Sequence, residues 1–508
     1  MNTDYYSSVV DIVRARRSSD RPAIVDGEHR LTYADLDTSS NRVAQMLLSL
    51  GIESGDRVGF LGRNCAEFFE LLFGAAKMGA VVCAVNWRLS AEEVAYVLGD
   101  SGAGTVIAHT EFLHMVPTTL RIVVLDGDSN DSYTARRDAA PNLDPNGTPA
   151  PDDTWLQLYS SGTTGHPKGV LITYGNLAAF LDAGLDVNHL APESVSLVAL
   201  PVFHIGGTGW AMQGLASGAT IVLMREMTPA GALRLVGQHR VTHSLWVPTM
   251  VQMITVCDEP ADVSSIELIM YGAAPISDTT LIEAIERFGN VFVGAYGLTE
   301  TCGPLVFLAA QDHDPSGPRS HLLRSAGRPA LNTELKVVDP ATLEELPDGT
   351  DGEILIRSPQ VMAGYWGLSG ATASSMVDDW LRTGDIGNLQ DGYLYVNDRL
   401  KDMIISGGEN VYPAEVENVV AAHPAVLEVA IIGVPHEKWG ETPIAFVVLR
   451  AGETVTEGEF IAFGRERLAG FKCPTAVVFC DALPRNASGK LLKRELRAPY
   501  WEGLTRRV

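Results

Sequence analysis

The sequence predicts an α/β protein, in which a large first part with doubly wound parallel sheets is followed by a smaller α+β domain. Three observations predict this order. Strand-like apolar runs alternate with stretches of helical periodicity between residues 31 and 300. The pattern changes to short strands with Asp-Gly turns between residues 334 and 357. A charged segment at residues 398–402 precedes a final stretch that is long enough for a compact module of its own.

The first elements follow from apolar periodicity and its breakers. Residues 31–36 lead into a helix whose apolar period continues to Leu50 and ends at Gly51. Residues 57–61 are expected to form a buried strand, and residues 65–78 the next helix. This alternation implies a parallel sheet that is covered on both faces.

A segment with four prolines, residues 139–153, is expected to be a linker or a surface loop. A strand at residues 155–159 follows it and leads into a glycine-rich loop, after which residues 176–185 have helical periodicity. Further strands are predicted between helical runs, at residues 196–200, 220–223, 245–247, 268–271 and 291–296.

The last part reads as a separate α+β module that begins after the charged segment. Its expected order is strand, helix, strand, strand, at residues 403–406, 413–422, 426–434 and 444–449.

Composition places the chain among globular proteins of more than one domain. It has 508 residues, of which 46% are hydrophobic and 20% charged. The formal net charge of -24 argues against general nucleic-acid binding, which needs a basic face to displace counterions from phosphates. An acidic enzyme that binds polyanions instead needs local basic regions.

Cysteine spacing and apolar runs narrow the class further. The six cysteines contain no C-x-x-C pair and the chain has no H-E-x-x-H motif, so neither a zinc site nor a disulfide framework is expected. No stretch reaches the roughly 18 apolar residues of a membrane span. We therefore expect a cytoplasmic protein, a monomer or homodimer, whose contact with membranes is at most peripheral.

The glycine-rich loop at residues 159–170 is the strongest local signal of function. It combines hydroxyl side chains with glycines whose backbone N–H groups can close around phosphate oxygens, and Lys168 adds a positive charge. It is not a Walker A loop, because Pro167 stands before Lys168 and no Ser or Thr follows. A flexible surface turn is the alternative, but the density of glycine and hydroxyl groups favours a nucleotide-phosphate loop.

With this loop, nine ordered motifs resemble the adenylate-forming superfamily of acyl- and aryl-CoA synthetases, peptide-synthetase adenylation domains and beetle luciferases. The chain looks most like a bacterial AMP-forming fatty-acyl-CoA synthetase. The motifs lie at residues 159–170, 200–204, 272–275, 296–300, 352–353, 383–385, 398–402, 406–410 and 484–490.

The resemblance implies a fold and a division into domains. An N-terminal AMP-binding domain, residues 1–397, would contain two doubly wound α/β subdomains and a small β-barrel-like subdomain. Residues 398–402 would form a hinge. Residues 403–508 would form a small, mobile α+β C-terminal lid that carries the adenylation lysine, Lys490.

The resemblance also implies a reaction in two halves, with ATP, Mg²⁺ and coenzyme A. A carboxylic acid attacks the α-phosphate of ATP to give acyl-AMP and pyrophosphate, and the acyl group then passes to CoA with release of AMP. Glu300 and Thr163 would hold Mg²⁺, Thr299 would donate to the α-phosphate, and Lys490 would bridge the acyl carboxylate and the α-phosphate.

The implied nucleotide site is larger. Asp385 would accept both ribose hydroxyls, which suits a carboxylate because it only accepts hydrogen bonds. Arg399 would contact ribose and phosphate, and Tyr296 with the 272–275 backbone would sandwich adenine. The full expected set is Ser160, Ser161, Gly162, Thr163, Thr164, Gly165, Lys168, Gly272, Ala273, Ala274, Pro275, Tyr296, Gly297, Asp385 and Arg399.

Lys401 occupies the hinge position of the family. Rotation of the C-terminal domain about it would move Lys490 out of the active site and bring in a segment that lines a channel for the pantetheine arm of CoA. Asp398 stands where many members have glycine and adds negative charge beside this hinge. The expected CoA contacts are Ser406, Gly407, Gly408, Trp439, Gly440 and Lys472.

The acid itself is expected to be hydrophobic. His204 occupies the position where amino-acid-activating members carry an acidic residue, so an α-amino acid is disfavoured as the substrate. His204 instead resembles a residue that gates the acyl pocket. The expected acyl pocket, from motif spacing, is Phe203, Gly207, Trp210, Met212, Val247, Met250, Met253, Tyr271 and Leu298.

This lining favours a fatty, alicyclic or steroid-derived acid. An aryl-CoA ligase of the benzoate or coumarate type and an enzyme that loads a carrier protein remain as alternatives. A nucleotide-binding regulator without catalytic activity would be expected to lack Lys490 or Glu300, and both are present.

Overall fold

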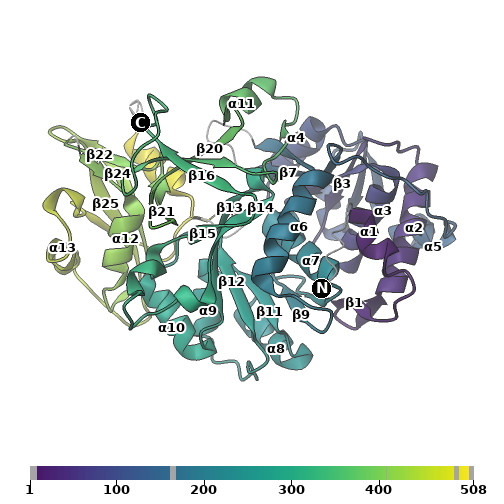
Figure 1. The fold of residues 1–508 in the computed structure, drawn as a ribbon, viewed down its shortest axis with the longest axis horizontal. Coiled ribbons are helices and arrows are strands. Elements are labelled where there is room, and N and C mark those ends of the chain that lie inside the picture. Colours follow the sequence, from purple (N-terminus) through teal and green to yellow (C-terminus); the bar gives the residue numbers. More distant parts are fainter. Residues whose placement is uncertain (1–8, 161–166, 408, 486–490, 503–508) are drawn as a thin grey trace.

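The computed structural model describes residues 9–160, 167–407, 409–485 and 491–502. Four β-sheets organise these residues (Figure 1). Two large sheets consist mainly of parallel strands, a third is small and antiparallel, and a fourth lies in the C-terminal part. The purple N-terminal elements and the yellow-green C-terminal elements lie at opposite ends of the molecule in Figure 1.

The nine-stranded sheet has the order β15-β14-β13-β12-β11-β9-β10-β1-β2. Its six inner strands are parallel, and β2, β14 and β15 pair antiparallel at the two edges. The strands are β1 (Pro22–Asp26), β2 (His29–Thr32), β9 (Val195–Val198), β10 (Thr220–Leu223), β11 (His243–Trp246), β12 (Leu268–Gly272), β13 (Phe292–Leu298), β14 (Gly303–Leu308) and β15 (Arg328–Pro329).

The seven-stranded sheet has the order β18-β8-β7-β4-β3-β5-β6, with β7, β4, β3, β5 and β6 parallel. β8 and β18 pair antiparallel at one edge. The strands are β3 (Arg57–Leu61), β4 (Val81–Val85), β5 (Thr105–Ala108), β6 (Arg121–Val124), β7 (Thr154–Ser160), β8 (Lys168–Thr173) and β18 (Gly364–Tyr365).

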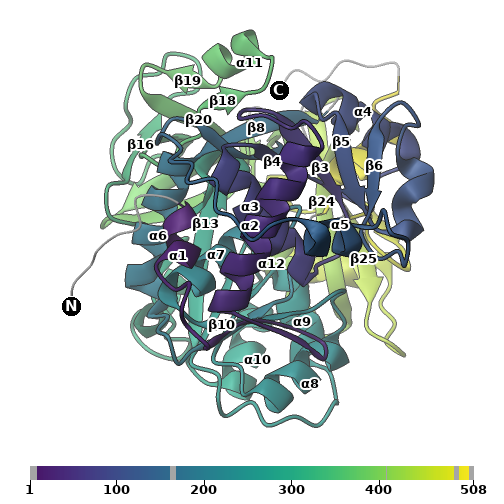
Figure 2. The same cartoon turned by 90° about the vertical axis from the view of Figure 1, so that its right-hand side faces the viewer.

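Helices cover both sheets, and α2 and α3 lie side by side (Figure 2). The helices are α1 (Val9–Arg14), α2 (Tyr33–Ser49), α3 (Ala66–Met78), α4 (Ala91–Ser101), α5 (Tyr133–Ala139), α6 (Tyr174–Asn188), α7 (Ile205–Ser217), α8 (Pro229–His239), α9 (Pro248–Thr255) and α10 (Asp278–Phe288). No helix in the described part of the chain is both long and apolar enough to cross a membrane.

One apolar core joins the two large sheets. It combines Phe60 of β3 and Ile221 of β10 with Phe69 of α3 and Met212 of α7, all of which are fully buried. Because helices of both sheets contribute to the same cluster, the two sheets are fixed relative to each other by burial of apolar surface. This arrangement holds the carboxyl ends of their parallel strands in constant positions.

The third sheet is antiparallel and has the order β16-β17-β20-β19, with β21 also paired to β20. Its strands are β16 (Glu334–Val338), β17 (Gly352–Arg357), β19 (Met376–Val377), β20 (Trp380–Gln390) and β21 (Tyr393–Arg399), and the short α11 (Ser369–Ser374) precedes β19. This sheet is the small β-rich subdomain that the turns in the sequence predict.

The C-terminal sheet has the order β23-β22-β25-β24, with β26 paired to β25. Its elements are β22 (Ile404–Ser406), β23 (Glu409–Val411), α12 (Pro413–Ala421), β24 (Val426–His436), β25 (Gly440–Leu449), α13 (Glu457–Arg465), β26 (Val477–Phe479) and α14 (Lys493–Arg497). The predicted strand, helix, strand, strand order is confirmed, with a further short strand, β23, between β22 and α12.

The predicted strands of the first part are also confirmed, with shifts of a few residues at their ends. One feature of the topology was not foreseen. β1 and β2 belong to the nine-stranded sheet, although the next strands along the chain, β3 to β8, build the other sheet. The apolar pattern of a strand carries no information on which sheet it joins.

Candidate functional site

Glu300 lies where the two large sheets meet. It follows β13 in a short turn that Thr301 holds, because the Leu298 N–H donates to Thr301 Oγ1 at 2.8 Å and this hydroxyl donates to the Gly303 carbonyl at 2.8 Å. Ser160, the last residue of β7 in the other sheet, donates to Glu300 Oε1 at 2.9 Å. The turn therefore presents Glu300 to both sheets.

A tyrosine that the motifs did not single out also contacts Glu300. The Tyr365 hydroxyl donates to Glu300 Oε1 at 3.0 Å, and burial together with this carboxylate raises the pKa of Tyr365. Lys168 Nζ lies 4.8 Å from the centre of the Tyr365 ring. Pairing of β18 with β8 brings Tyr365 to this place, and the sequence signal that marks it is the Gly-Tyr-Trp-Gly segment at residues 364–367.

Within the described residues, both hydrogen bonds to the side-chain carboxylate of Glu300 go to Oε1, which leaves Oε2 for a cation. The described residues contain no cluster of three or more His, Cys, Asp or Glu side chains that could hold a metal by themselves. One free carboxylate oxygen suits Mg²⁺, which binds through one or two carboxylates plus substrate phosphates.

Asp385 is the second carboxylate of the candidate site, after Glu300, and it is 3% exposed. The Tyr296 hydroxyl donates to Asp385 Oδ2 at 2.8 Å, and Arg399 Nε lies 2.7 Å from Oδ1. Burial alone would lower the pKa of Arg399, but Asp385, together with the further acidic groups around it, raises it. Burial and the same carboxylate raise the pKa of Tyr296. Each oxygen of Asp385 keeps a lone pair for another donor.

Glu353 supports the turn that carries Asp385, although no role for it was predicted. Its carboxylate, 2% exposed, accepts from Arg382 Nε at 3.0 Å and from the Gly384 N–H at 3.3 Å. The Thr383 hydroxyl donates to the Ile354 carbonyl at 2.7 Å. These bonds fix the Thr-Gly-Asp turn against β17.

The expected adenine platform needs its glycines for close packing. A Cβ added at Gly272 would lie 2.2 Å from the Ala295 carbonyl oxygen, and one at Gly297 would lie 2.2 Å from that of Gly303. Ala273 adopts a φ of 69°, a region that side chains other than glycine rarely enter. β12 and β13 are neighbours, so residues 272–275 and Tyr296 lie at the same edge of the sheet.

Several predicted residues lie outside the described part of the chain, so their positions stay predictions. They are Ser161, Gly162, Thr163, Thr164 and Gly165 of the glycine-rich loop, Gly408 of the CoA set, and Lys490. Thr299 is described and lies in the same turn as Glu300.

His204 lies at the start of α7, and its ring packs on Phe203 at 4.6 Å between ring centres. Its Nε2 is buried and has no hydrogen-bond partner among the described residues. Burial, and after it the charge of Arg88, lowers the pKa of His204 to about 4. The ring is therefore neutral at pH 7 and cannot supply a positive charge there.

Asn64, which sequence reasoning missed, holds the segment before His204. Its amide nitrogen donates to the carbonyls of Leu200 and Met224, at 2.9 and 3.0 Å, and its oxygen accepts from the Val202 N–H at 2.9 Å. The amide thus ties the ends of β9 and β10 together.

A cavity of about 180 Å³ opens at the carboxyl ends of β9, β10 and β11. The ends of β3 and β4 of the other sheet face it through Asn64, Trp87 and Arg88. It is lined by Asn64, Trp87, Arg88, Ala199, Leu200, Pro201, Arg225, Glu226, Met227, Val247, Thr249, Met250 and Met253. Open α/β sheets bind ligands at this carboxyl edge, and the neighbouring strands β12 and β13 carry the expected adenine site.

The rim of this cavity is cationic and aromatic. The guanidinium carbons of Arg63 and Arg88 lie 4.6 and 4.7 Å from the centre of the Trp87 ring. Arg63 pairs with Glu226 and, at 2.9 Å, with Glu111. Burial lowers the pKa of Arg88, and its guanidinium stays charged because arginine is not deprotonated in proteins.

The structure brings together only part of the expected acyl pocket. Val247, Met250 and Met253 line the cavity, whereas the other six expected residues are not part of its lining. Trp210 and Met212 belong to the buried core, where Trp210 Nε1 donates to the Leu197 carbonyl at 3.2 Å. The Tyr271 hydroxyl pairs with His313 Nε2 at 3.0 Å.

The described CoA candidates mostly gather at one end of the C-terminal sheet. Ser406 pairs with Gly440, and the Gly407 N–H donates to the Trp439 carbonyl at 2.8 Å. A Cβ at Gly407 would lie 2.8 Å from the Trp439 ring, which is 45% exposed. Lys472 instead pairs with Glu415 at 2.7 Å.

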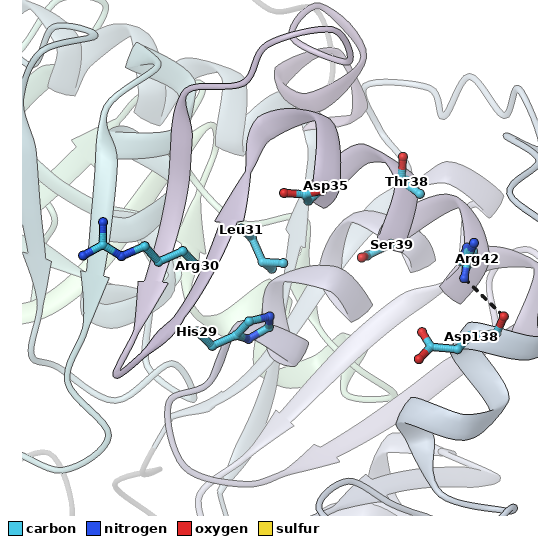
Figure 3. A pocket seen from close by; sticks show the side chains of 8 residues that line it. All are labelled: His29, Arg30, Leu31, Asp35, Thr38, Ser39, Arg42 and Asp138. Atoms are coloured by element: carbon cyan, nitrogen blue, oxygen red, sulfur yellow. Dashed lines mark hydrogen bonds between the residues drawn. The ribbon is translucent and has the colours of Figure 1, made fainter.

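A larger surface hollow, about 310 Å³, lies where β2 leads into α2 and includes Asp138 of α5 (Figure 3). Thr32 and Asp35 form a capping box for α2 there, and Arg42 donates to the Asp138 carbonyl at 3.2 Å. Its lining contains none of the residues that the motifs point to: His29, Arg30, Leu31, Asp35, Thr38, Ser39, Arg42 and Asp138.

Comparisons with known proteins show the family of this chain. The AMP-binding enzyme family matches residues 13–366, and the AMP-binding enzyme C-terminal domain matches residues 415–490. A fatty acid–[acyl-carrier-protein] ligase of Streptomyces coeruleorubidus is 39% identical and covers 97% of this chain and 96% of its own. A feruloyl-CoA synthase of Amycolatopsis sp is 39% identical, over 96% of this chain and 97% of its own.

Solved structures are similar along the same length. The o-succinylbenzoate CoA synthetase of Bacillus subtilis, in complex with its acyl-adenylate intermediate, has a TM-score of 0.86 and 32% identity. The match covers 96% of this chain and 98% of that one. ATP-bound MatB of Rhodopseudomonas palustris has a TM-score of 0.90 and 29% identity, over 97% and 99% of the two chains.

Proposed function

Because this chain belongs to the AMP-binding enzyme family and is an AMP-forming acid–thiol ligase, we propose that it activates a hydrophobic carboxylic acid and transfers it to coenzyme A. The observation that carries the proposal is the meeting of Glu300, Asp385 and Arg399 at the carboxyl edge of the nine-stranded sheet. ATP-dependent activation needs one carboxylate that binds a metal cation and a second that accepts the two ribose hydroxyls of ATP.

In the first half-reaction, an oxygen of the acid forms a bond to the α-phosphorus of ATP and the bond to pyrophosphate breaks. Asp385, held by Tyr296 and Arg399, accepts the ribose hydroxyls and orients the nucleotide. Glu300 Oε2 would hold Mg²⁺, which supplies neutralisation of phosphate charge when bound. The role of Lys490 rests on its motif in the sequence.

For the second half-reaction, we propose that the 180 Å³ cavity takes the thiol arm of CoA. Apolar side chains around a narrow space suit the pantetheine arm, and Arg88 with Arg225 at the rim suits the phosphates of CoA. On this proposal Val247, Met250 and Met253 contact the thiol arm and not the acid. α9, which carries Met250 and Met253, also touches the lid, since Gln252 Nε2 donates to the Leu427 carbonyl at 2.8 Å.

The acid is then expected beyond His204, with Phe203, Gly207, Tyr271 and Leu298 as the remaining candidates. A hydrophobic acid is supported by two relatives of equal identity whose names give a fatty acid and a feruloyl group. A neutral, apolar-packed His204 offers no charge to a substrate ammonium, which disfavours an α-amino acid.

The test is mass spectrometry of reactions with ATP, Mg²⁺ and a panel of fatty, benzoate-like, cinnamate-like, alicyclic and steroid-derived acids, each with and without CoA. A CoA thioester that forms together with AMP supports the proposal, and the best acid defines the pocket. Absence of both acyl-AMP and thioester across the panel contradicts it.

A carrier-loading enzyme is the second candidate, favoured by the 39% identity to a ligase that acts on an acyl carrier protein. The same reactions with a phosphopantetheinylated carrier protein as acceptor separate the two. Acyl-AMP that persists with CoA but disappears with the carrier would replace our proposal by this one.

A further inference from the structure

A largely buried cluster of charges connects the start of the C-terminal helix α14 to β21, the strand that runs into the predicted hinge at residues 398–402. Lys493, the first residue of α14, places Nζ 2.8 Å from Glu417 Oε1 of α12 and 3.8 Å from Asp398 Oδ2 of β21. The three side chains are 12%, 18% and 7% exposed. One cation thus holds two carboxylates from two different elements.

The carboxylates of this cluster are also bound to the backbone. Asp398 Oδ2 accepts from the Ala414 N–H in the first turn of α12 at 2.9 Å, and Oδ1 accepts from the Arg399 N–H at 2.7 Å. Glu417 Oε1 accepts from the Ile431 N–H of β24 at 2.7 Å. Each group therefore has one position that satisfies all its partners.

The charges in the cluster depend on each other. Burial raises the pKa of Asp398 and of Glu417 and would lower that of Lys493, but the two carboxylates raise the pKa of Lys493 instead. Asp402, which pairs with Arg497 at 3.0 Å, also faces Lys493. Without the lysine, two carboxylates would share a site from which water is largely excluded.

The cluster is connected along the chain to two residues of the predicted site. Asp398 directly precedes Arg399, which pairs with Asp385 at 2.7 Å. Lys490 precedes Lys493 by three residues, so the chain limits the separation of their Cα atoms to about 11 Å. A shift of Lys493 relative to Asp398 therefore changes where the Lys490 segment can reach.

We propose that Lys493 is a positioning residue for the activation half-reaction, which it supports by fixing the start of α14 against Asp398 and Glu417. The inference rests on the proposed function, in which Lys490 serves that half-reaction. Asp398 lies before the predicted hinge at Lys401, and Lys493 with Glu417 lies after it. The cluster thus ties the lid to the ribose-binding strand in the orientation of this structure.

The test compares the two half-reactions in Lys493→Gln, Lys493→Arg and the wild-type protein, with the acid that the substrate panel selects. ATP–pyrophosphate exchange reports activation, and thioester formation from supplied acyl-AMP reports transfer. We expect Lys493→Gln to slow exchange by up to about 10²-fold, as for small displacements of a catalytic group. In Lys493→Gln the loss should appear in the kcat of exchange and not in the KM for ATP, while the rate of acyl transfer to CoA changes little. Lys493→Arg, which keeps the positive charge, should restore exchange.

Arg497→Gln is the matched control, because it removes from the same helix a cation that pairs with Asp402, at the end of the hinge segment, and not with Asp398. It should leave the ratio of the two half-reactions unchanged. Equal slowing of both half-reactions by Lys493→Gln, or slowing of neither, overturns the inference.

If Lys493→Gln does not fold, as judged by its thermal unfolding midpoint, Asp398→Asn takes its place. Asparagine keeps an acceptor for the Ala414 N–H but removes the charge, so the inference predicts the same selective loss of exchange. Failure of the proposed function is distinguishable, because the wild-type protein would then show no exchange with any acid.

Discussion

Glu300 receives hydroxyl donors from two directions, from Ser160 and from Tyr365, and both bind the same oxygen. This arrangement orients the carboxylate and keeps the other oxygen for a cation. On the proposed function, the Tyr365 hydroxyl would therefore support Mg²⁺ binding by Glu300 without contacting substrate itself.

We expect Tyr365→Phe to raise the Mg²⁺ concentration that gives half-maximal ATP–pyrophosphate exchange. A hydrogen bond to a charged group contributes about 1.5–3 kcal/mol, so an increase of about tenfold is the scale of the effect. Magnesium titration of the exchange rate measures it. Tyr393→Phe is a control, because its hydroxyl contacts Asp312 at 3.2 Å and not Glu300; equal shifts in both variants would contradict the role of Tyr365.

Arg88 tests the use of the cavity between the sheets. If the cavity takes CoA, Arg88→Ala should raise the KM for CoA and leave ATP–pyrophosphate exchange unchanged, because exchange needs no thiol. Loss of a charge-assisted contact predicts a change of about tenfold or more. A raised KM for the acid in the exchange assay would instead assign the cavity to the acid.

The structure pairs Ser160 with Glu300, and Tyr296 and Arg399 with Asp385, but the roles of these motif residues stay predictions. The residues that hold them were not predicted. Tyr365 reaches Glu300 only because β18 pairs with β8, almost 200 positions earlier in the chain. Such pairings leave no local periodicity, so a single sequence does not reveal them.

At the scale of elements, the Thr-Gly-Asp turn depends on β17, through Glu353. Glu353→Gln should loosen the turn, because it breaks the ion pair with Arg382 and weakens the bond from the Gly384 N–H. We expect a free energy of unfolding lower by about 1–3 kcal/mol and a higher KM for ATP. Both are measurable, by denaturant unfolding and by exchange kinetics.

The neighbouring pair Arg357–Glu334 offers the control for this variant. It lies on the same sheet, but its side chains are 40% and 61% exposed. Glu334→Gln should therefore change the free energy of unfolding by less than about 1 kcal/mol and leave the KM for ATP unchanged. If the two variants behave alike, Glu353 does not support the turn.

At the scale of the whole molecule, buried histidines link stability to pH. Burial lowers the pKa of His204, His243 and His313 to about 4 each. Their ordinary value is about 6.5, so the unfolded chain binds more protons between these limits. The stabilisation is complete above about pH 6.5 and is lost as the pH falls toward 4.

We expect the thermal unfolding midpoint to fall between pH 6.5 and 4, and His313→Gln to reduce that slope. His313 accounts for one of the protons that the unfolded chain binds and the folded chain does not between about pH 6.5 and 4. It therefore contributes about 1.4 kcal/mol per pH unit to the change in the free energy of unfolding. The measurement is the unfolding midpoint against pH for both proteins. An unchanged slope in His313→Gln would show that His313 titrates normally in the folded protein.

The assembly of the sheets was less predictable than the strands themselves. β1, at residues 22–26, was not predicted, and it adds to a sheet whose next member, β10, lies at residues 220–223. Likewise, the cationic rim of the cavity combines Arg88 and Arg225 from different sheets. Both facts follow from packing of the whole core and not from any local pattern.

The placement of β1 and β2 also sets an order of events on the ribosome. These strands leave the exit tunnel early, yet β10, the second partner of β1, follows only after the whole of β3 to β8 has been made. Until then β1 can pair only with β2, and its other edge and its apolar side chains expose the nascent chain to aggregation. Slow synthesis across residues 27–220 would therefore lengthen the interval in which this protein needs a chaperone.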